Sequence, residues 1–141
     1  MPKGTTFDTD LLALLFNATA MSLAQNNATA NGNLFISLHT ADPSGGNQNT
    51  SEAAYTSYAR VAVVRTSGGW TVSGNNVVNA ANITFPACTG GSANVTYVGI
   101  GQNNTGVGGE IYYSGALTAS LNISNGITPQ FNSGNLKVTE S

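Results

Sequence analysis

Ser37, His39 and Asp42 lie within the stretch "LFISLHTADP" (34–43) and combine the three side-chain types of a nucleophilic hydrolase site. His39 is the only histidine in the chain. In a strand, positions 37 and 39 share a face about 7 Å apart, too far for direct hydrogen bonding without bending. Asp42 precedes Pro43, as at the start of a turn. In addition, the three residues of a working triad come from separate elements of the fold, whereas these three lie in one short segment. We therefore predict a strand end and a turn, with His39 bonded to a neighbouring carbonyl, and no enzyme activity.

Four other candidate sites have simpler structural interpretations. Asp42 and Glu52 could bind calcium across the loop between them, but the spacing is not that of an EF-hand, and we predict solvated loop acids. The segment "GIGQNNTGVGGE" (99–110) lacks the lysine and the helix of a phosphate loop, so we predict a hairpin loop. Cys88 has no adjacent base and is expected to be a packed thiol. Trp70 could offer a carbohydrate platform, but a core position is favoured.

Composition excludes several classes of partner. Only 7% of the 141 residues are charged, and the net charge is −2 with four Lys plus Arg. Nucleic-acid binding needs clustered cations, and membrane-surface binding needs a basic face, so we expect neither. A single cysteine rules out an internal disulfide and a cysteine zinc site. We predict no cofactor and no metal.

The hydrophobic pattern predicts one helix followed by strands. In "FDTDLLALLFNATAMSLA" (7–24), apolar residues recur at spacings of three and four, with Leu12 and Phe16 off the main stripe. Short alternating segments separated by Gly/Asn turns then follow at intervals of about ten residues. The predicted fold is all-β, an antiparallel, jelly-roll-like β-sandwich preceded by one N-terminal α-helix. We expect an arm and amphipathic helix over 1–30 and the β-sandwich domain over 31–141.

The strings "LFISLHTADP", "YARVAV", "GWTV", "ITFPA" and "YSGAL", with the start "MPKG", resemble a family of small tailed-bacteriophage virion proteins. Its members are variously described as tail or tail-fibre proteins, and those with this N-terminal form look like capsid cement proteins. The resemblance implies a decoration protein made in the host cytoplasm and placed on the capsid surface of the virion. It would bridge subunits of the major capsid protein, or neighbouring virion proteins, as a homo-oligomer (dimer or trimer). The alternatives are a tail or tail-fibre component, or a carbohydrate-binding module on the virion.

Two segments are candidates for protein interfaces. The apolar helix could mediate self-association or capsid docking, although it could equally cover its own sheet. The loop "SGGNQNTSEAAYTSY" could bind through tyrosines, which are good interface anchors. The predicted contact residues are Leu11, Leu14, Leu15, Phe16, Tyr55 and Tyr58.

Overall fold

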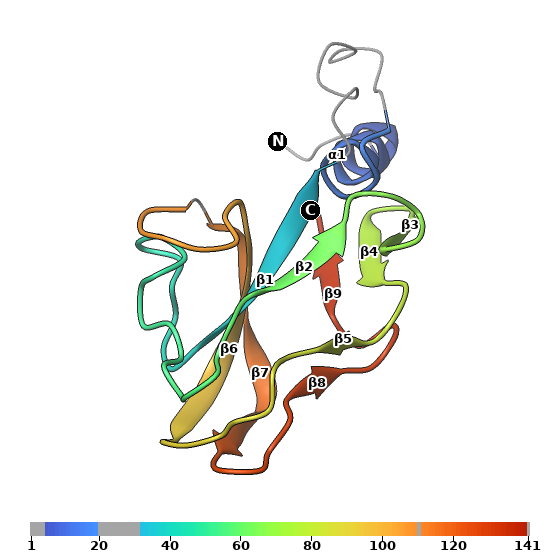
Figure 1. Cartoon of the computed structure of the whole chain (residues 1–141). Helices are drawn as coiled ribbons and strands as arrows, with labels where there is room; N and C mark the ends of the chain where they lie inside the picture. Colours follow the sequence, from blue (N-terminus) through green and yellow to red (C-terminus); the bar gives the residue numbers. More distant parts are fainter. Residues whose placement is uncertain (1–4, 20–31, 110, 141) are drawn as a thin grey trace. The chain divides into compact units, whose positions relative to one another are not determined.

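The computed structural model describes residues 5–19, 32–109 and 111–140 (Figure 1). Their regular elements are antiparallel strands preceded by one helix, with long loops between them, which confirms the predicted all-β class with an N-terminal helix. The elements are α1 (Thr5–Asn17), β1 (Asn33–His39), β2 (Val61–Val64), β3 (Trp70–Ser73), β4 (Asn76–Asn79), β5 (Ile83–Thr84), β6 (Ala93–Gly101), β7 (Ile111–Ile123), β8 (Gln130–Phe131) and β9 (Lys137–Thr139).

The chain groups into two compact units, each assembled from separated segments. The first comprises Met1–Asn33, Val63–Ile83 and Phe131–Ser141, and the second comprises Leu34–Ala62 and Thr84–Gln130. The short strands β2, β5 and β8 each begin in one unit and end in the other. The domain boundary expected near residue 30 falls outside the described residues and stays a prediction.

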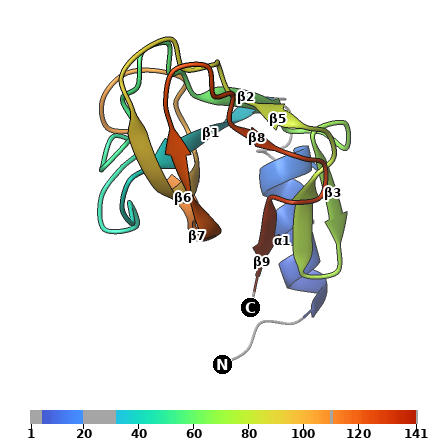
Figure 2. The same cartoon turned by 90° about the horizontal axis from the view of Figure 1, so that it is seen from below.

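The first unit is a small sheet covered by the helix. Its strands run in the order β3-β4-β9, both pairs antiparallel, and α1 contacts β3 and β4 on one face (Figure 2). The β3–β4 hairpin turns at Gly74, whose φ of 59° is a left-handed conformation that glycine adopts without strain. Val77 on β4 lies opposite Val138 on β9, and both are buried. The unit therefore has an apolar core of its own.

The helix buries a different face from the one the sequence stripe suggested. Leu12 and Phe16, four residues apart and so on one face, are fully buried. Phe16 packs edge-on against Trp70, with ring centroids 4.4 Å apart. The remaining predicted contact residues of the helix are only partly buried: Leu11, Leu14 and Leu15. The predicted stripe was wrong because the helix is apolar around most of its circumference, and periodicity could not identify the side that meets the sheet.

The helix ends earlier than predicted, at Asn17 rather than near residue 24. Ala18 takes a positive φ of 50°, which breaks the helical path. The Arg65 guanidinium donates hydrogen bonds to the carbonyls of Leu14 (2.6 Å) and Leu15. These carbonyls lie in the last turn, where backbone acceptors lack helical partners and a cation is favoured. Residues 20–24 of the predicted helix lie outside the described residues.

The second unit carries a four-stranded sheet in the order β2-β1-β6-β7. β1 pairs antiparallel with β6, and β6 pairs antiparallel with β7. The alternating apolar residues of β1, Leu34, Ile36 and Leu38, are buried as predicted. Ser37 and His39, on the opposite face of the same strand, are also fully buried. Both faces of this end of β1 are thus covered, and its polar residues must find partners inside the protein.

Candidate functional site: a polar anchor beneath two loops

Ser37 and His39 form a direct hydrogen bond inside the second unit. Ser37 Oγ lies 2.8 Å from His39 Nε2, and His39 Nδ1 lies 2.9 Å from the carbonyl of Thr50. Because that carbonyl can only accept, Nδ1–H is the donor, and Nε2 is left to accept the hydroxyl proton of Ser37. The expectation that these two side chains lie too far apart to bond was wrong. The expectation that His39 bonds a neighbouring carbonyl is confirmed.

A glycine on the neighbouring strand makes the space for this pair. Gly99 on β6 lies directly opposite Ser37. A Cβ at Gly99 would come within 2.7 Å of His39 Nε2, 2.8 Å of Ile111 Cδ1 and 2.9 Å of Ser37 Oγ. Real Cβ atoms do not make such contacts, so the close approach of the two side chains depends on glycine at this position. The first glycine of "GIG" has a packing role.

Asp42 does not complete a catalytic trio. Its Oδ1 accepts the backbone N–H of Ser44 at 2.9 Å and lies 3.4 Å from Ser114 Oγ, while the carbonyl of Thr50 takes the place beside His39 Nδ1. Burial lowers the pKa of His39, which favours the neutral imidazole. Ser37 and His39 each have 0% exposed surface. In this conformation the pair contacts protein alone.

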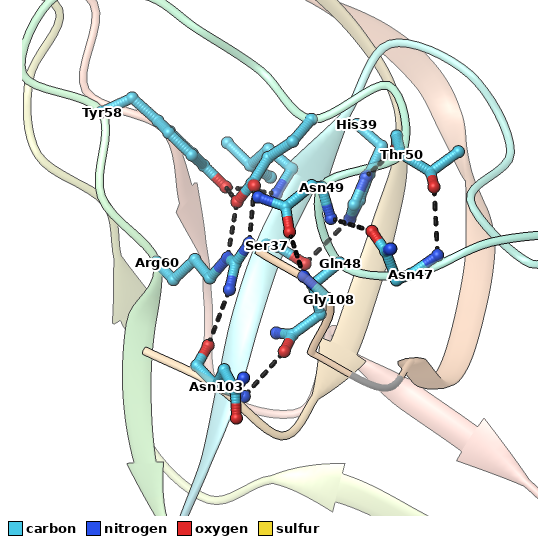
Figure 3. A network of polar contacts seen from close by, with 12 residues as sticks. Ser37, His39, Asn47, Gln48, Asn49, Thr50, Tyr58, Arg60, Asn103 and Gly108 are labelled. Carbon is cyan, nitrogen blue, oxygen red and sulfur yellow. Dashed lines mark hydrogen bonds and ion pairs between the residues drawn. The ribbon is translucent and has the colours of Figure 1, made fainter. Parts of the chain in front are cut away.

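Glu52 is the centre of a second buried polar cluster. Its carboxylate accepts two hydrogen bonds from Arg60, from Nε and from Nη2, each at 2.7 Å (Figure 3). The hydroxyl of Tyr58 donates to the same carboxylate at 2.8 Å and accepts the backbone N–H of Leu38 at 3.1 Å. Bidentate pairs of this geometry are the strong form of the ion pair. The prediction that Glu52 is a solvated loop acid was wrong.

The electrostatics of this cluster favour its charged pair. The side chains of Arg60 and Glu52 are only 3% and 14% exposed. Hydrogen bonds to Glu52 raise the pKa of Arg60, so the guanidinium stays charged, whereas burial raises the pKa of Tyr58 and keeps its hydroxyl protonated. Removing one partner of such a pair would leave an uncompensated buried charge. The cluster therefore holds the backbone of residues 52–60 firmly against β1.

The same cluster reaches the loop between β6 and β7. Arg60 Nη1 donates to the carbonyl of Asn103 at 3.0 Å, and the backbone N–H of Asn103 donates to Gln48 Oε1 at 2.7 Å. The backbone N–H of Gln48 donates to the carbonyl of Gly109 at 2.8 Å, and Asn49 Oδ1 accepts the N–H of Gly108 at 2.8 Å. Figure 3 shows Gln48 and Asn49 of one loop beside Asn103 and Gly108 of the other.

Gln48 lies wholly inside this junction. It has 0% exposed surface, and a Cβ at Gly101 or Gly109 would clash with its side chain at 2.4 Å and 2.3 Å respectively. The two glycines thus make room for the amide in the same way that Gly99 makes room for the Ser37–His39 pair. Within the described residues, Gln48 Nε2 is buried without a hydrogen-bond partner.

We call Gln48, Glu52, Tyr58, Arg60 and Asn103 together the loop anchor. It fixes residues 40–60 and 102–109 to each other and to β1. Loops carry binding functions in many proteins because a rigid scaffold presents them, and a fixed loop loses less entropy when it binds. This geometry suits a preorganised recognition surface.

The two tyrosines predicted as interface anchors make contacts inside the protein, Tyr55 being buried and Tyr58 half-buried. Tyr55 is 3% exposed, and its hydroxyl donates to the carbonyl of Pro86 at 2.9 Å. Its ring packs edge-on against that of Tyr58, with centroids 5.3 Å apart, and the Tyr58 ring stacks on Phe85 at 6.5 Å. The loop thus folds back and uses these rings in its own interior, and their contact with a partner stays a prediction.

The other sequence candidates take structural positions. Trp70 has 0% exposed surface and Cys88 has 1%, which confirms both as core residues. Residues 102–109 lie between the paired strands β6 and β7, as predicted for a hairpin loop. Asp42 is exposed, as predicted. Among the described residues no three His, Cys, Asp or Glu side chains come close enough to share a metal ion.

In the described part of the chain, no helix is both long and apolar enough to cross a bilayer.

Sequence reasoning missed three residues of the loop anchor, Gln48, Arg60 and Asn103, and the ion pair of Arg60 with Glu52. Charged residues are scarce in this chain, so a Glu and an Arg eight positions apart in one polar segment were a usable signal for an ion pair. Gln48 and Asn103 gave no such signal, because they are two among many amide side chains. Their partners come from the other loop, and only the fold brings the two loops together.

The described fold and loop anchor define a β-rich scaffold protein with buried polar groups beneath two loops. A family model described as podophage GP4 fiber I protein gp80 matches residues 5–139. The chain therefore belongs to this family of phage fibre proteins, and it is a virion structural protein. No curated protein matches the chain.

Proposed function

We propose that this chain is a structural subunit of a fibre on the virion and that it acts by binding neighbouring virion proteins, without catalysis. The observation that carries the proposal is the family match, which extends over residues 5–139 and so includes both units. The family description names a fibre protein and is the reason to prefer the fibre over the capsid surface.

The loop anchor supports a binding role by a physical argument. Interfaces form more tightly when their surfaces are fixed before binding, because less conformational entropy is lost. The anchor fixes both loops through buried groups and leaves residues at the tips exposed, among them Thr105, Gly106 and Val107. Few charges lie on this chain, so little charge would have to be desolvated at a contact. Burial of Ser37 and His39 supports a role without catalysis.

Capsid decoration is the second candidate. The observation in its favour is the "MPKG" start followed by an apolar helix, which resembles cement-type head proteins. A decoration protein would bridge major capsid subunits and raise the free energy needed to separate them. Carbohydrate binding through Trp70 is less well supported, because that ring packs against Phe16 and is not exposed to solvent.

Immunogold labelling of intact virions separates the candidates. An epitope inserted after Gly106 suits this experiment, because space around this loop position is open and the residue is exposed. Gold on fibres is the expected result. Gold distributed over the faces of the head would support decoration and refute the fibre proposal. Untagged virions carried through the same procedure give the background.

A further inference from the structure

His39 joins the end of β1 to residues 50–52, which we call the latch segment. Its ring donates from Nδ1 to the carbonyl of Thr50 at 2.9 Å (Figure 3). The backbone of His39 also forms an antiparallel bridge with that of Glu52. The imidazole therefore helps to fix the latch segment against β1.

The latch segment contains a strained residue. Ser51 has a φ of 53°, a left-handed conformation that is unfavourable for a residue with a Cβ. Such a conformation persists only where the surroundings hold it. The ring of His39 holds the segment beside Thr50, and the ion pair with Arg60 holds it at Glu52. Loss of either contact lets the segment relax.

The latch segment is also connected to the second loop, residues 102–109. The N–H of Thr50 donates to the carbonyl of Asn47 at 2.9 Å, and its hydroxyl accepts the N–H of Asn47 at 3.0 Å. The next two residues, Gln48 and Asn49, carry the hydrogen bonds to the second loop described above. Release of the latch segment would therefore loosen both loops.

The closed form has no place for a positive charge on the imidazole. The ring is fully buried, and its Nε2 accepts the hydroxyl proton of Ser37. A proton on Nε2 would oblige that hydroxyl to turn away. Both oxygens of Glu52 are already engaged, by Arg60 and by Tyr58. The imidazolium would thus be a buried cation without a free carboxylate, which is costly.

The charged groups around His39 act in both directions. Burial lowers the pKa of His39, a backbone hydrogen bond and the charge of Glu52 raise it, and Arg60 lowers it; the net direction is downward. On β6, Tyr97 stands opposite His39, and the strand carries no charged residue. Asp42, in the loop after β1, is exposed and bonds Ser44. Of the described groups, none offsets the cost of burying the imidazolium.

We propose that residues 50–52 form an acid-released latch: when His39 takes up a proton from solvent, the latch segment leaves the ring and both loops lose their fixed geometry. The surface that these loops present is then preorganised at neutral pH and loosened in acid. The inference rests on the proposed function only for the binding role of the loops.

Hydrogen exchange followed by mass spectrometry tests the latch in the purified full chain. Rates are measured at about pH 7.5 and about pH 5.0, and each is divided by the intrinsic rate at the same pH. An exposed imidazole with a pKa of about 6.5 is almost fully protonated at the lower pH, so opening gains up to about thirtyfold. Protection of residues 40–52 should therefore fall roughly five- to thirtyfold in wild type. It should stay below that of β6 at both pH values, because the latch opens without unfolding the sheet.

Three variants separate the proton from the strain. His39→Gln keeps a donor for the Thr50 carbonyl and takes up no proton, so its protection should be the same at both pH values. Ser51→Gly removes the strain and should raise the protection of residues 50–52 at both pH values. Ser57→Gly is the matched control, because Ser57 also has a left-handed φ, of 79°, but lies outside the latch segment.

Nitrogen NMR of the imidazole gives an independent measurement. His39 is the only histidine, so one pair of ring signals reports on it without ambiguity. At neutral pH these signals should show the proton on Nδ1. On acidification, protonation of the ring and loss of loop protection should share one midpoint.

Four results would overturn the proposal: equal protection of wild-type loops at the two pH values, the same acid loss in His39→Gln, an imidazole that becomes charged while the loops stay protected, or Ser51→Gly no better protected at residues 50–52 than Ser57→Gly. The location of the chain in the virion is measured separately by immunogold. Fibre labelling together with loops that ignore pH would reject the latch and leave the proposed function intact.

Discussion

Substituting Gly99→Ala should destabilise the second unit by about 2–4 kcal/mol. The added Cβ would meet Ile111 Cδ1 at 2.8 Å, and the far end of an isoleucine can move. It would also meet His39 Nε2 at 2.7 Å and Ser37 Oγ at 2.9 Å, and these two groups are held by each other and by the carbonyl of Thr50. Overpacking costs about 1–3 kcal/mol, and a buried hydrogen bond left unmade costs about as much. Side-chain movement would relieve part of the clash, so the expected loss of stability is smaller than these two costs added together.

Gly115→Ala is the matched control, because Gly115 is also a strand glycine of the same sheet, and a Cβ there would meet nothing within 4 Å. Urea denaturation followed by circular dichroism should place Gly99→Ala well below wild type and Gly115→Ala close to it. Hydrogen exchange should report faster opening of residues 40–60 in the first variant alone. Equal stability of the two variants would refute the argument that glycine is required for the Ser37–His39 pair.

Three further predictions test other parts of the account. Glu52→Gln should lower the free energy of unfolding by about 2–4 kcal/mol, since it leaves the Arg60 guanidinium buried without its carboxylate. A decrease below about 0.5 kcal/mol in a denaturant titration would mean that the pair behaves as a surface ion pair. Burial lowers the pKa of His39 below 6.5, so the unfolded state binds more protons there and the free energy of unfolding should fall as the pH drops below about 6.5. Stability measured against pH should lose this step in His39→Gln, and an unchanged profile would contradict the assignment. Phe16→Ala should cost about 3–5 kcal/mol and Leu14→Ala clearly less, because only Phe16 is fully buried; the reverse order in thermal denaturation would restore the stripe predicted from sequence.

The fold class was predictable because strand alternation and glycine-rich turns are local signals. The period of two in Leu34, Ile36 and Leu38 identified β1, and the Gly/Asn segments marked the loop after β6. The buried face of the helix was not predictable, because apolar residues surround it. Only the packing of Phe16 on Trp70, a contact between distant segments, selects the side that is covered.

The site was harder to predict than the fold because it is made of long-range contacts. The strand-spacing argument for Ser37 and His39 used an ideal strand and could not include Gly99, which stands opposite from another part of the chain. Glu52 looked like a loop acid until Arg60 and Tyr58 were seen to enclose it. Tyrosines in a polar loop indicate an interface as well as they indicate a core, and the packing of Tyr55 and Tyr58 on each other could not be read from the sequence.

The central claim is that this chain is a fibre subunit that acts through contacts with other virion proteins. The most direct measurement compares cryo-electron microscopy maps of virions with and without this polypeptide. The account predicts that virions lacking it will lose fibre density while the capsid shell keeps its normal appearance. Fibres that are complete in its absence, or density lost from the capsid surface instead, would contradict the claim.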